Sequence, residues 1–252
     1  MKTTEWCLYR ELAWIDSIIA PPENYKEETE TFCKAIKEHS KIEVKTLLHL
    51  GCGSGIHDYN FKKYFDVTGV DISETMLEFA KKVNPELKYL YGDMRTIRLK
   101  ESFDAVAIVD SIGHMVTLED LQKAILTAYK HLKVGGVLFL SASIKEEFRE
   151  NNFVYTGKKD DVAVTLFENN YITDPEGTTY EATVVCLIRR KGKLEIHNDS
   201  VTIGLFKLEA WLSLLREVGF EVEHMRLDNS YDRFILEEGE YPLTIFVCNK
   251  PF

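Results

Sequence analysis

The alternation of short apolar runs with helical segments between residues 46 and 143 constrains the fold of this 252-residue chain more than any other feature. Strands that are apolar along their whole length are typical of a parallel sheet that helices cover on both faces. The sequence therefore predicts an α/β core. The five runs are TLLHL, FDVTGV, LKYLY, FDAVAIV and GGVLFLSAS.

Two flanking regions depart from this rhythm. The first 40 residues have a helical composition, with one segment to about Ala20 and a second after the Pro21-Pro22 break. Residues 153–205 are rich in Val, Thr, Ile, Tyr and Phe between turn sequences, which predicts an antiparallel β-meander. The predicted divisions are an N-terminal helical cap (1–44), an α/β core (45–150), a β insertion on the substrate or dimer side (151–206) and a return to the core sheet (207–252).

Charge and cysteine usage exclude several classes of protein. The formal net charge is −10, whereas proteins that coat DNA or RNA depend on clustered Lys and Arg. No stretch reaches the roughly 18 uncharged apolar residues of a membrane span, and the N-terminal stretch is too charged for a signal peptide. Five scattered cysteines without a C-x-x-C pair indicate reduced thiols. We therefore expect a cytoplasmic protein without nucleic-acid or membrane partners.

A glycine-rich turn, LLHLGCGSGIHD, follows the first apolar run. Gly51, Gly53 and Gly55 leave its backbone bare, so that a ligand can approach closely. A P-loop needs a Gly-Lys pair where Ile56 and His57 stand, which excludes that motif. The dinucleotide fingerprint needs a glycine at position 56, so the match to it is incomplete.

Acidic residues follow the next two strands. Asp71 lies about 20 positions after the first glycine, where a carboxylate can accept hydrogen bonds from both ribose hydroxyls. The sequence predicts Ser73 as the N-cap of the following helix. The alternative for Asp71 is that it helps to open this helix. Asp93 can accept the amino group of adenine and Met94 can pack on the ring, and the alternative for Asp93 is a helix N-cap.

Four motifs across roughly residues 45–143 resemble, in order and spacing, those of class I methyltransferases that use S-adenosylmethionine (SAM). They are GCGSG, VTGVDIS, YGDMR, and FDAVAIVDSIGHM with the following LKVGGVLFL. The resemblance implies SAM as cofactor and a Rossmann-like sheet of parallel strands plus an antiparallel last strand, with N-terminal helices and the inserted meander. The SAM-binding residues that it implies are Tyr25, Gly51, Gly53, Gly55, Asp71, Ile72, Met76, Asp93, Met94, Asp110 and Ser111.

The same resemblance implies roles within this set. The loop glycines let the backbone approach the methionine part of SAM, and Asp71 takes the ribose. Asp110 and Ser111 lie beneath the reactive sulfonium. Tyr25 closes over SAM, and the alternative is a half-buried helix residue.

Further stretches resemble a narrower group, the nucleotide-linked amino-sugar N,N-dimethyltransferases. They are CGSGIH, DISETMLEFA, GDMRTIRLKESFDAV, SIGHM and LKVGGVLFL, and the β insertion falls at the same place. This resemblance implies His114 near the acceptor amine, as a base or an electrostatic partner; the alternative is a cap of the next helix. Those enzymes have a Tyr-Asp pair where this chain has Ile15-Asp16, and Trp14 and Tyr9 are the nearby aromatic candidates to fill the space.

We predict a SAM-dependent methyltransferase that acts on a small-molecule acceptor, in first place an amine nitrogen. The alternatives are O- or C-methyl transfer to another small metabolite and a SAM-binding protein without transfer activity. A nicotinamide dehydrogenase is disfavoured by Ile56 and by Asp93-Met94. No histidines show metal-ligand spacing, so a metal-free enzyme is expected. The exposed edge of the insertion is a candidate homodimer surface.

Overall fold

A central sheet organises the computed structural model, which describes residues 6–228, 231–236 and 238–252. Within these residues the sheet has seven strands in the order β10-β11-β5-β4-β1-β2-β3. Neighbours among β1 to β5 pair in parallel, whereas β11 runs antiparallel to both β5 and β10. This confirms the predicted parallel sheet with an antiparallel last strand. The strands are β1 (Thr46–Leu50), β2 (Asp66–Asp71), β3 (Lys88–Tyr91), β4 (Phe103–Ile108), β5 (Leu132–Ala142), β10 (Glu221–Leu227) and β11 (Leu243–Asn249).

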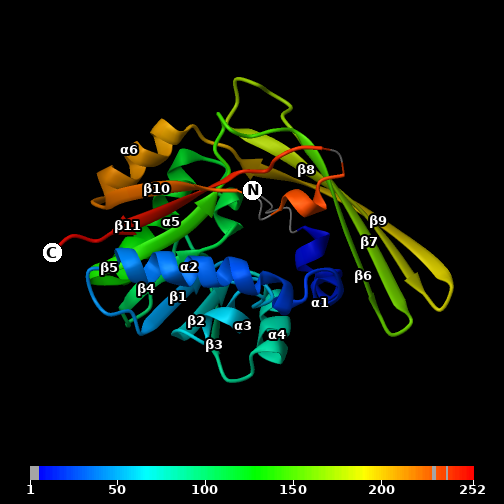
Figure 1. Ribbon diagram of the computed structural model, residues 1–252, viewed down its shortest axis with the longest axis horizontal. Helices are drawn as coiled ribbons and strands as arrows, with labels where there is room; N and C mark the ends of the chain where they lie inside the picture. The colour runs from blue at the N-terminus through cyan, green and yellow to red at the C-terminus, as the bar shows by residue number, and fades with distance from the viewer. Residues whose placement is uncertain (1–5, 229–230, 237) are drawn as a thin grey trace.

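Helices cover both faces of this sheet, as Figure 1 shows. On one face, α2 (Lys26–His39) and the short α3 (Asp58–Phe61) pack against one set of alternating strand residues, which includes Leu47 of β1. On the other face, α5 (Leu118–His131) and α6 (Leu208–Val218) pack against the other set, which includes Leu48 of β1. Because successive residues of a strand point to opposite faces, a strand between two helical layers is apolar throughout.

Side-chain caps begin two of the helices. The Ser73 hydroxyl accepts the backbone N–H of Met76 (3.2 Å) and opens α4 (Glu74–Val83), which confirms the predicted cap. The Thr117 hydroxyl accepts the N–H of Asp120 (3.1 Å) and opens α5. The alternative that His114 caps this helix is therefore wrong.

The segment before Ala20 differs from the single helical segment expected. It forms two 3-10 turns, η1 (Cys7–Tyr9) and η2 (Ala13–Ile15), and the four-residue α1 (Asp16–Ile19). Its buried residues, which include Leu12 and Ile15, pack in one cluster with the inserted sheet. Packing against that sheet, which composition does not reveal, holds the segment as separate turns.

The insertion is a second sheet of four consecutive antiparallel strands, which confirms the predicted meander. Its strands are β6 (Asn151–Lys159), β7 (Val162–Tyr171), β8 (Thr179–Arg190) and β9 (Lys193–Gly204). This sheet extends away from the core, and α1 and η5 (Asp232–Phe234) lie between the two (Figure 1). Across the described residues, no helix is both long and apolar enough for a membrane crossing.

Candidate functional site

The order of the central strands indicates where a ligand binds. Both β2 and β4 pair with β1, so the chain leaves the middle of the sheet in opposite directions. In open α/β sheets the ligand crevice lies outside the carboxyl ends of the strands at this switch point. The segments that leave these ends are the glycine loop after β1 and residues 109–114 after β4, which include η4 (Ser111–His114).

The glycine loop is bare and open where a ligand would approach. Gly51 and Gly53 have φ values of +72° and +55°, a region that favours glycine. A Cβ on Gly51 would lie 2.6 Å from Ser111 Cβ and 2.8 Å from Met94 Cε, so this loop, η4 and the YGDMR turn meet here. A Cβ on Gly53 would have no atom within 4 Å. Because Gly51 is crowded and Gly53 is open, a ligand can lie against the backbone of Gly53.

A buried polar network supports the loop from below. The Asp58 carboxylate bonds His49 Nδ1 at 2.6 Å and accepts the Tyr89 hydroxyl at 3.0 Å. Asn84 Nδ2 donates to the carbonyl of Gly55 at 2.9 Å. These hydrogen bonds link the carbonyl of Gly55 to the groups beneath the loop, while His49 Nε2 and Asn84 Oδ1 are buried without a partner in the described residues. No local pattern in the sequence predicts the network, because its members come from four separate segments.

Asp71 organises the loop and the following helix together. One carboxylate oxygen accepts the N–H of Gly53 and the other accepts the N–H of Ser73, both at 2.8 Å. Burial raises the pKa of Asp71, and these backbone N–H groups oppose that rise. Each oxygen keeps acceptor capacity, so ribose binding and helix opening do not exclude each other. The neighbouring Ile72 is exposed, and Met76 is buried behind the cap.

Arg95 neutralises Asp93. Its Nη2 donates to the Asp93 carboxylate at 2.6 Å, its Nε donates to both oxygens of that carboxylate at 3.0 Å, and its Nη1 donates to Asp120 at 3.1 Å. Burial raises the pKa of Asp93, but the hydrogen bonds from Arg95 outweigh burial and lower it. Residues 94–96 form a turn, so the helix N-cap alternative for Asp93 is wrong. No local pattern in the sequence indicates this role of Arg95.

Two carboxylates face each other beyond β4. Asp110 has a φ of +59°, and such strain in a non-glycine residue is typical of functional sites. Its carboxylate accepts hydroxyls from Ser141 (2.9 Å) and Tyr231 (2.8 Å). Both carboxylate oxygens of Glu28 on α2 are buried, and no hydrogen bond of ordinary geometry reaches them within the described part of the chain, although Tyr231 and Arg233 lie close. Burial and then the charge of Asp110 raise the pKa of Glu28 to about 8.

These orphaned oxygens are a test of fit for SAM. A buried carboxyl without a partner is costly unless a ligand supplies one. SAM carries two positive centres, an ammonium and a sulfonium, so its charge complements Asp110 and favours the ionised form of Glu28. The open space at Gly53 and the free acceptor capacity of Asp71 also fit it. Glu28 could not be predicted from the sequence, because it lies outside every motif.

Tyr9 is the aromatic residue that reaches His114. Its hydroxyl lies 2.9 Å from His114 Nε2, and its carbonyl accepts the Ser73 hydroxyl at 2.6 Å. Burial lowers the pKa of His114 to about 4, so the imidazole is neutral at pH 7. The other candidate, Trp14, stacks with Arg190 of the insertion at 5.2 Å. A phenol therefore stands beside His114, although Ile15 occupies the place expected for it.

The N-terminal segment and α2 fold over the glycine loop. The Ser54 hydroxyl donates to the Asp16 carboxylate at 2.9 Å, and burial raises the pKa of Asp16 to about 6. Tyr25, at the end of η3 (Pro22–Tyr25), packs edge-on against His57 with ring centroids 5.2 Å apart. Tyr25 is therefore next to the loop, as its predicted role requires.

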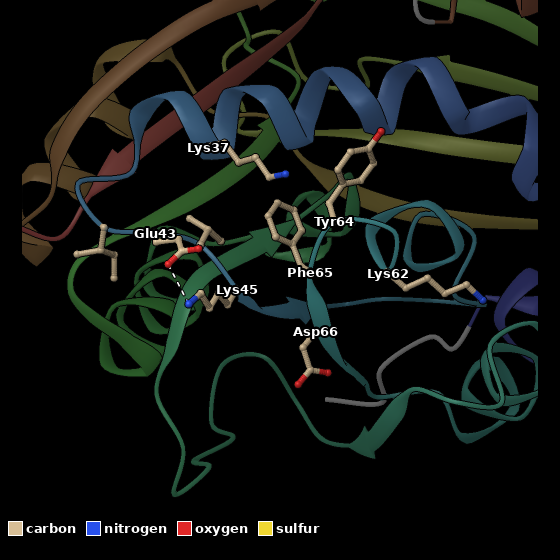
Figure 2. Close-up of a pocket in the computed structure, with 9 residues that line it drawn as sticks. Lys37, Glu43, Lys45, Lys62, Tyr64, Phe65 and Asp66 are labelled. Carbon is tan, nitrogen blue, oxygen red and sulfur yellow. Dashed lines mark ion pairs between the residues drawn. The ribbon is translucent and has the colours of Figure 1, made fainter.

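A surface pocket of about 690 Å³ lies at the opposite end of the sheet, beneath α2 (Figure 2). Lys45 immediately precedes β1 in the chain, and it pairs with Glu43 at 2.9 Å. Lys37 lies over the ring of Tyr64 at 4.8 Å. This pocket is outside the amino ends of the strands, away from the switch point, so we do not assign the site to it. In the described residues, no three His, Cys, Asp or Glu side chains are grouped to hold a metal.

Comparison with known sequences agrees with this geometry. Residues 48–140 match a protein family described as a methyltransferase domain. The dTDP-3-amino-3,4,6-trideoxy-alpha-D-glucopyranose N,N-dimethyltransferase of Streptomyces venezuelae is 40% identical over 98 residues, which are 38% of this chain. The match spans 41% of the length of that relative. The dTDP-3-amino-3,6-dideoxy-alpha-D-glucopyranose N,N-dimethyltransferase of Streptomyces fradiae is 26% identical over 205 residues, 80% of each chain.

Solved structures match over nearly the whole chain. Streptomyces venezuelae DesVI aligns with a TM-score of 0.78 and 25% identity, over 96% of both chains. The sugar N-methyltransferase KedS8 from Streptoalloteichus also has a TM-score of 0.78, at 20% identity, over 96% of this chain and 92% of that one. At 20% identity, the similarity to KedS8 shows a shared fold and nothing about activity. The N-terminal segment and the insertion are thus part of a fold shared with these proteins.

Proposed function

Because residues 48–140 form a SAM-dependent methyltransferase domain, we propose that this chain methylates the amine of a nucleotide-linked amino sugar. SAM is its cofactor, as the motifs indicated, and the dehydrogenase alternative is wrong. The observation that carries the proposed acceptor is the similarity to two curated dTDP-amino-sugar N,N-dimethyltransferases, one of which extends over 80% of the chain. The Tyr9–His114 pair beside the loop supports it.

We propose these residues as the SAM site. Asp71 takes the ribose, Asp93 and Met94 take the adenine, and Glu28 with Asp110 faces the ammonium. Tyr25 covers the bound molecule. When bound, SAM supplies a methyl group that the amine lone pair takes as the carbon–sulfur bond breaks. The proposed SAM residues of the sequence analysis are retained as a set: Tyr25, Gly51, Gly53, Gly55, Asp71, Ile72, Met76, Asp93, Met94, Asp110 and Ser111.

We propose that His114 orients the acceptor amine and that it is not protonated at neutral pH. With a pKa of about 4, its imidazole is the neutral form at physiological pH and a weak base. The hydroxyl of Tyr9 fixes Nε2, which leaves the other ring nitrogen for the acceptor. Alignment of two reactants and exclusion of water can by themselves accelerate a bimolecular step by several orders of magnitude.

Three broader predictions belong to the same proposal. The insertion and the N-terminal cap supply the acceptor side, within the divisions 1–44, 45–150, 151–206 and 207–252. The exposed edge of the inserted sheet is the surface for a homodimer. The five buried, unpaired cysteines support a reducing compartment, the cytoplasm.

Methyl transfer tests the proposal directly. The purified chain is incubated with SAM carrying a labelled methyl group and with dTDP-3-amino-3,6-dideoxyglucopyranose, and the products are analysed by mass spectrometry. We expect the addition of one or two methyl groups, and NMR of the product should place them on nitrogen. SAM binding in calorimetry without any transfer to this amine would contradict the proposed acceptor. Methylation at oxygen or carbon would instead support the alternative acceptor chemistries.

A further inference from the structure

One carboxylate on the inner face of the inserted sheet has no role in the SAM site. Glu168 on β7 pairs in register with Phe153 on β6 and Val184 on β8. Directly paired residues point to the same face of a sheet, and both partners are buried. Glu168 therefore points inward, whereas its neighbour Phe167 is 39% exposed on the outer face.

Glu168 interrupts an otherwise apolar surface. Leu166 and Val184 belong to the cluster that packs against the N-terminal segment, and Ala182 belongs to another cluster with Phe148. A carboxylate between two such clusters costs free energy unless it has a partner. Its hydrogen bond from Asn170 Nδ2 is 3.1 Å long. Within the described chain, no Lys or Arg forms an ion pair with it.

Two tyrosines lie on the same face of the inserted sheet as this carboxylate. Tyr155 is two positions from Phe153 on β6, and Tyr180 is four positions from Val184 on β8. Burial raises the pKa values of Tyr9, Tyr155, Tyr180 and Tyr241, and the charge of Glu168 adds to each rise. Tyr9 is the residue bonded to His114, and Leu12 and Ile15 of the same N-terminal segment pack in one cluster with Leu166 and Val184, next to Glu168.

The segment after β10 completes an aromatic wall in front of the inner face. The rings of Tyr155 and Phe234 are 4.7 Å apart, and those of Phe153 and Tyr241 are 5.0 Å apart. In Figure 1 this segment, η5, lies between the two sheets. Aromatic faces together with a carboxylate are the combination that recognises an ammonium group, including a methylated one.

We propose that Glu168 determines acceptor specificity by pairing with the ammonium form of the acceptor amine and of its methylated product, against the wall formed by Tyr155 and Tyr241. This inference rests on the proposed function and names the residue that selects a cationic acceptor. The amine must be neutral to react. Burial raises the pKa of Glu168, so the pair can hold its proton on the carboxylate oxygen and free the nitrogen lone pair.

Binding of two matched ligands tests the inference. One is dTDP-3-amino-3,6-dideoxyglucopyranose, and the other has a hydroxyl in place of the amine. Both are titrated calorimetrically into the chain saturated with S-adenosylhomocysteine. We expect Glu168→Gln to weaken binding of the amine ligand about tenfold or more, because a hydrogen bond to a charged group is lost. Binding of the hydroxyl ligand should change less than about twofold, and SAM affinity should not change.

Glu181→Gln is the matched control. Glu181 is exposed and pairs in register with the exposed Tyr171, so it lies on the outer face of the same sheet. This variant should bind both ligands as the wild type does. Glu168→Asp keeps the charge and should keep the preference for the amine ligand, which provides a second test if Glu168→Gln unfolds.

Three results would overturn the inference. They are equal weakening of both ligands in Glu168→Gln, unchanged binding of the amine ligand in that variant, and loss of the amine preference in Glu168→Asp. Each is distinct from failure of the proposed function, in which the wild type itself neither binds nor methylates the amine ligand.

Discussion

Replacing Gly51 and Gly53 separately by alanine tests how the loop is built. Both residues have positive φ, so an alanine side chain strains the backbone at either position. At Gly51 the new Cβ would also lie 2.6 Å from Ser111 Cβ, an atom that cannot move without the backbone of η4. At Gly53 the new Cβ would meet no atom within 4 Å. The pair therefore separates backbone strain from steric overlap.

The expected magnitudes follow from these contacts. A left-handed conformation costs a non-glycine residue about 1–2 kcal/mol, which applies to both variants. The overlap with Ser111 adds about 1–3 kcal/mol at Gly51 alone. The entropy that alanine removes from the unfolded chain is the same in both and cancels. Gly51→Ala should therefore be about 2 kcal/mol less stable than Gly53→Ala, or about 4–8 °C lower in Tm for a chain of this size.

Thermal unfolding of the two variants without ligand measures this difference, and calorimetry measures SAM affinity. We expect weaker SAM binding in both, because Gly53 faces the space assigned to the ligand. The double variant Gly51→Ala/Ser111→Gly should recover most of the stability lost in Gly51→Ala. Equal melting temperatures for Gly51→Ala and Gly53→Ala would refute the reasoning, since the overlap with Ser111 would then cost nothing.

Further predictions concern Tyr9, His114 and Asp104. Tyr9→Phe leaves His114 Nε2 without its partner and should lower kcat about tenfold or more, with SAM affinity unchanged in calorimetry. Because the pKa of His114 is about 4, kcat/KM of the wild type should show no inflection near pH 6.5. An inflection there that disappears in His114→Asn would contradict this. Burial raises the pKa of Asp104, but hydrogen bonds from Lys133 and from the backbone and side chain of Thr46 lower it to about 2. That depressed pKa contributes stability above about pH 4 that is lost as the pH falls towards 2. In urea unfolding, Asp104→Asn should therefore be about 2 kcal/mol less stable than wild type at pH 7, and a difference that persists undiminished at pH 3 would contradict this.

Local signals in the sequence predicted the parallel strands and the inserted sheet. Apolar runs that are buried on both faces predicted the parallel strands, and the turn-separated runs after residue 150 predicted the second sheet. The cap at Ser73 and the place of Asp71 after β2 also follow from neighbouring residues alone. Each of these signals is a pattern among neighbouring residues, where spacing is informative.

The partners of the site residues could not be predicted in this way. The bond between Tyr9 and His114 joins residues 105 positions apart, and Tyr231 reaches Asp110 across 121 positions. Periodicity carries no information about such pairs. The short turns before Ala20 were also missed, because their conformation depends on packing against the inserted sheet.

The sequence by itself determined the α/β order, the bare loop and the carboxylates after β2 and β3, since these depend on strand period and local hydrogen bonding. Only the tertiary structure determined which side chains meet at the carboxyl ends of the parallel strands. It placed Tyr9 beside His114, buried the carboxylate oxygens of Glu28 and turned Glu168 inward. The physical reason is that burial and charge act through space, between groups that lie far apart in the chain.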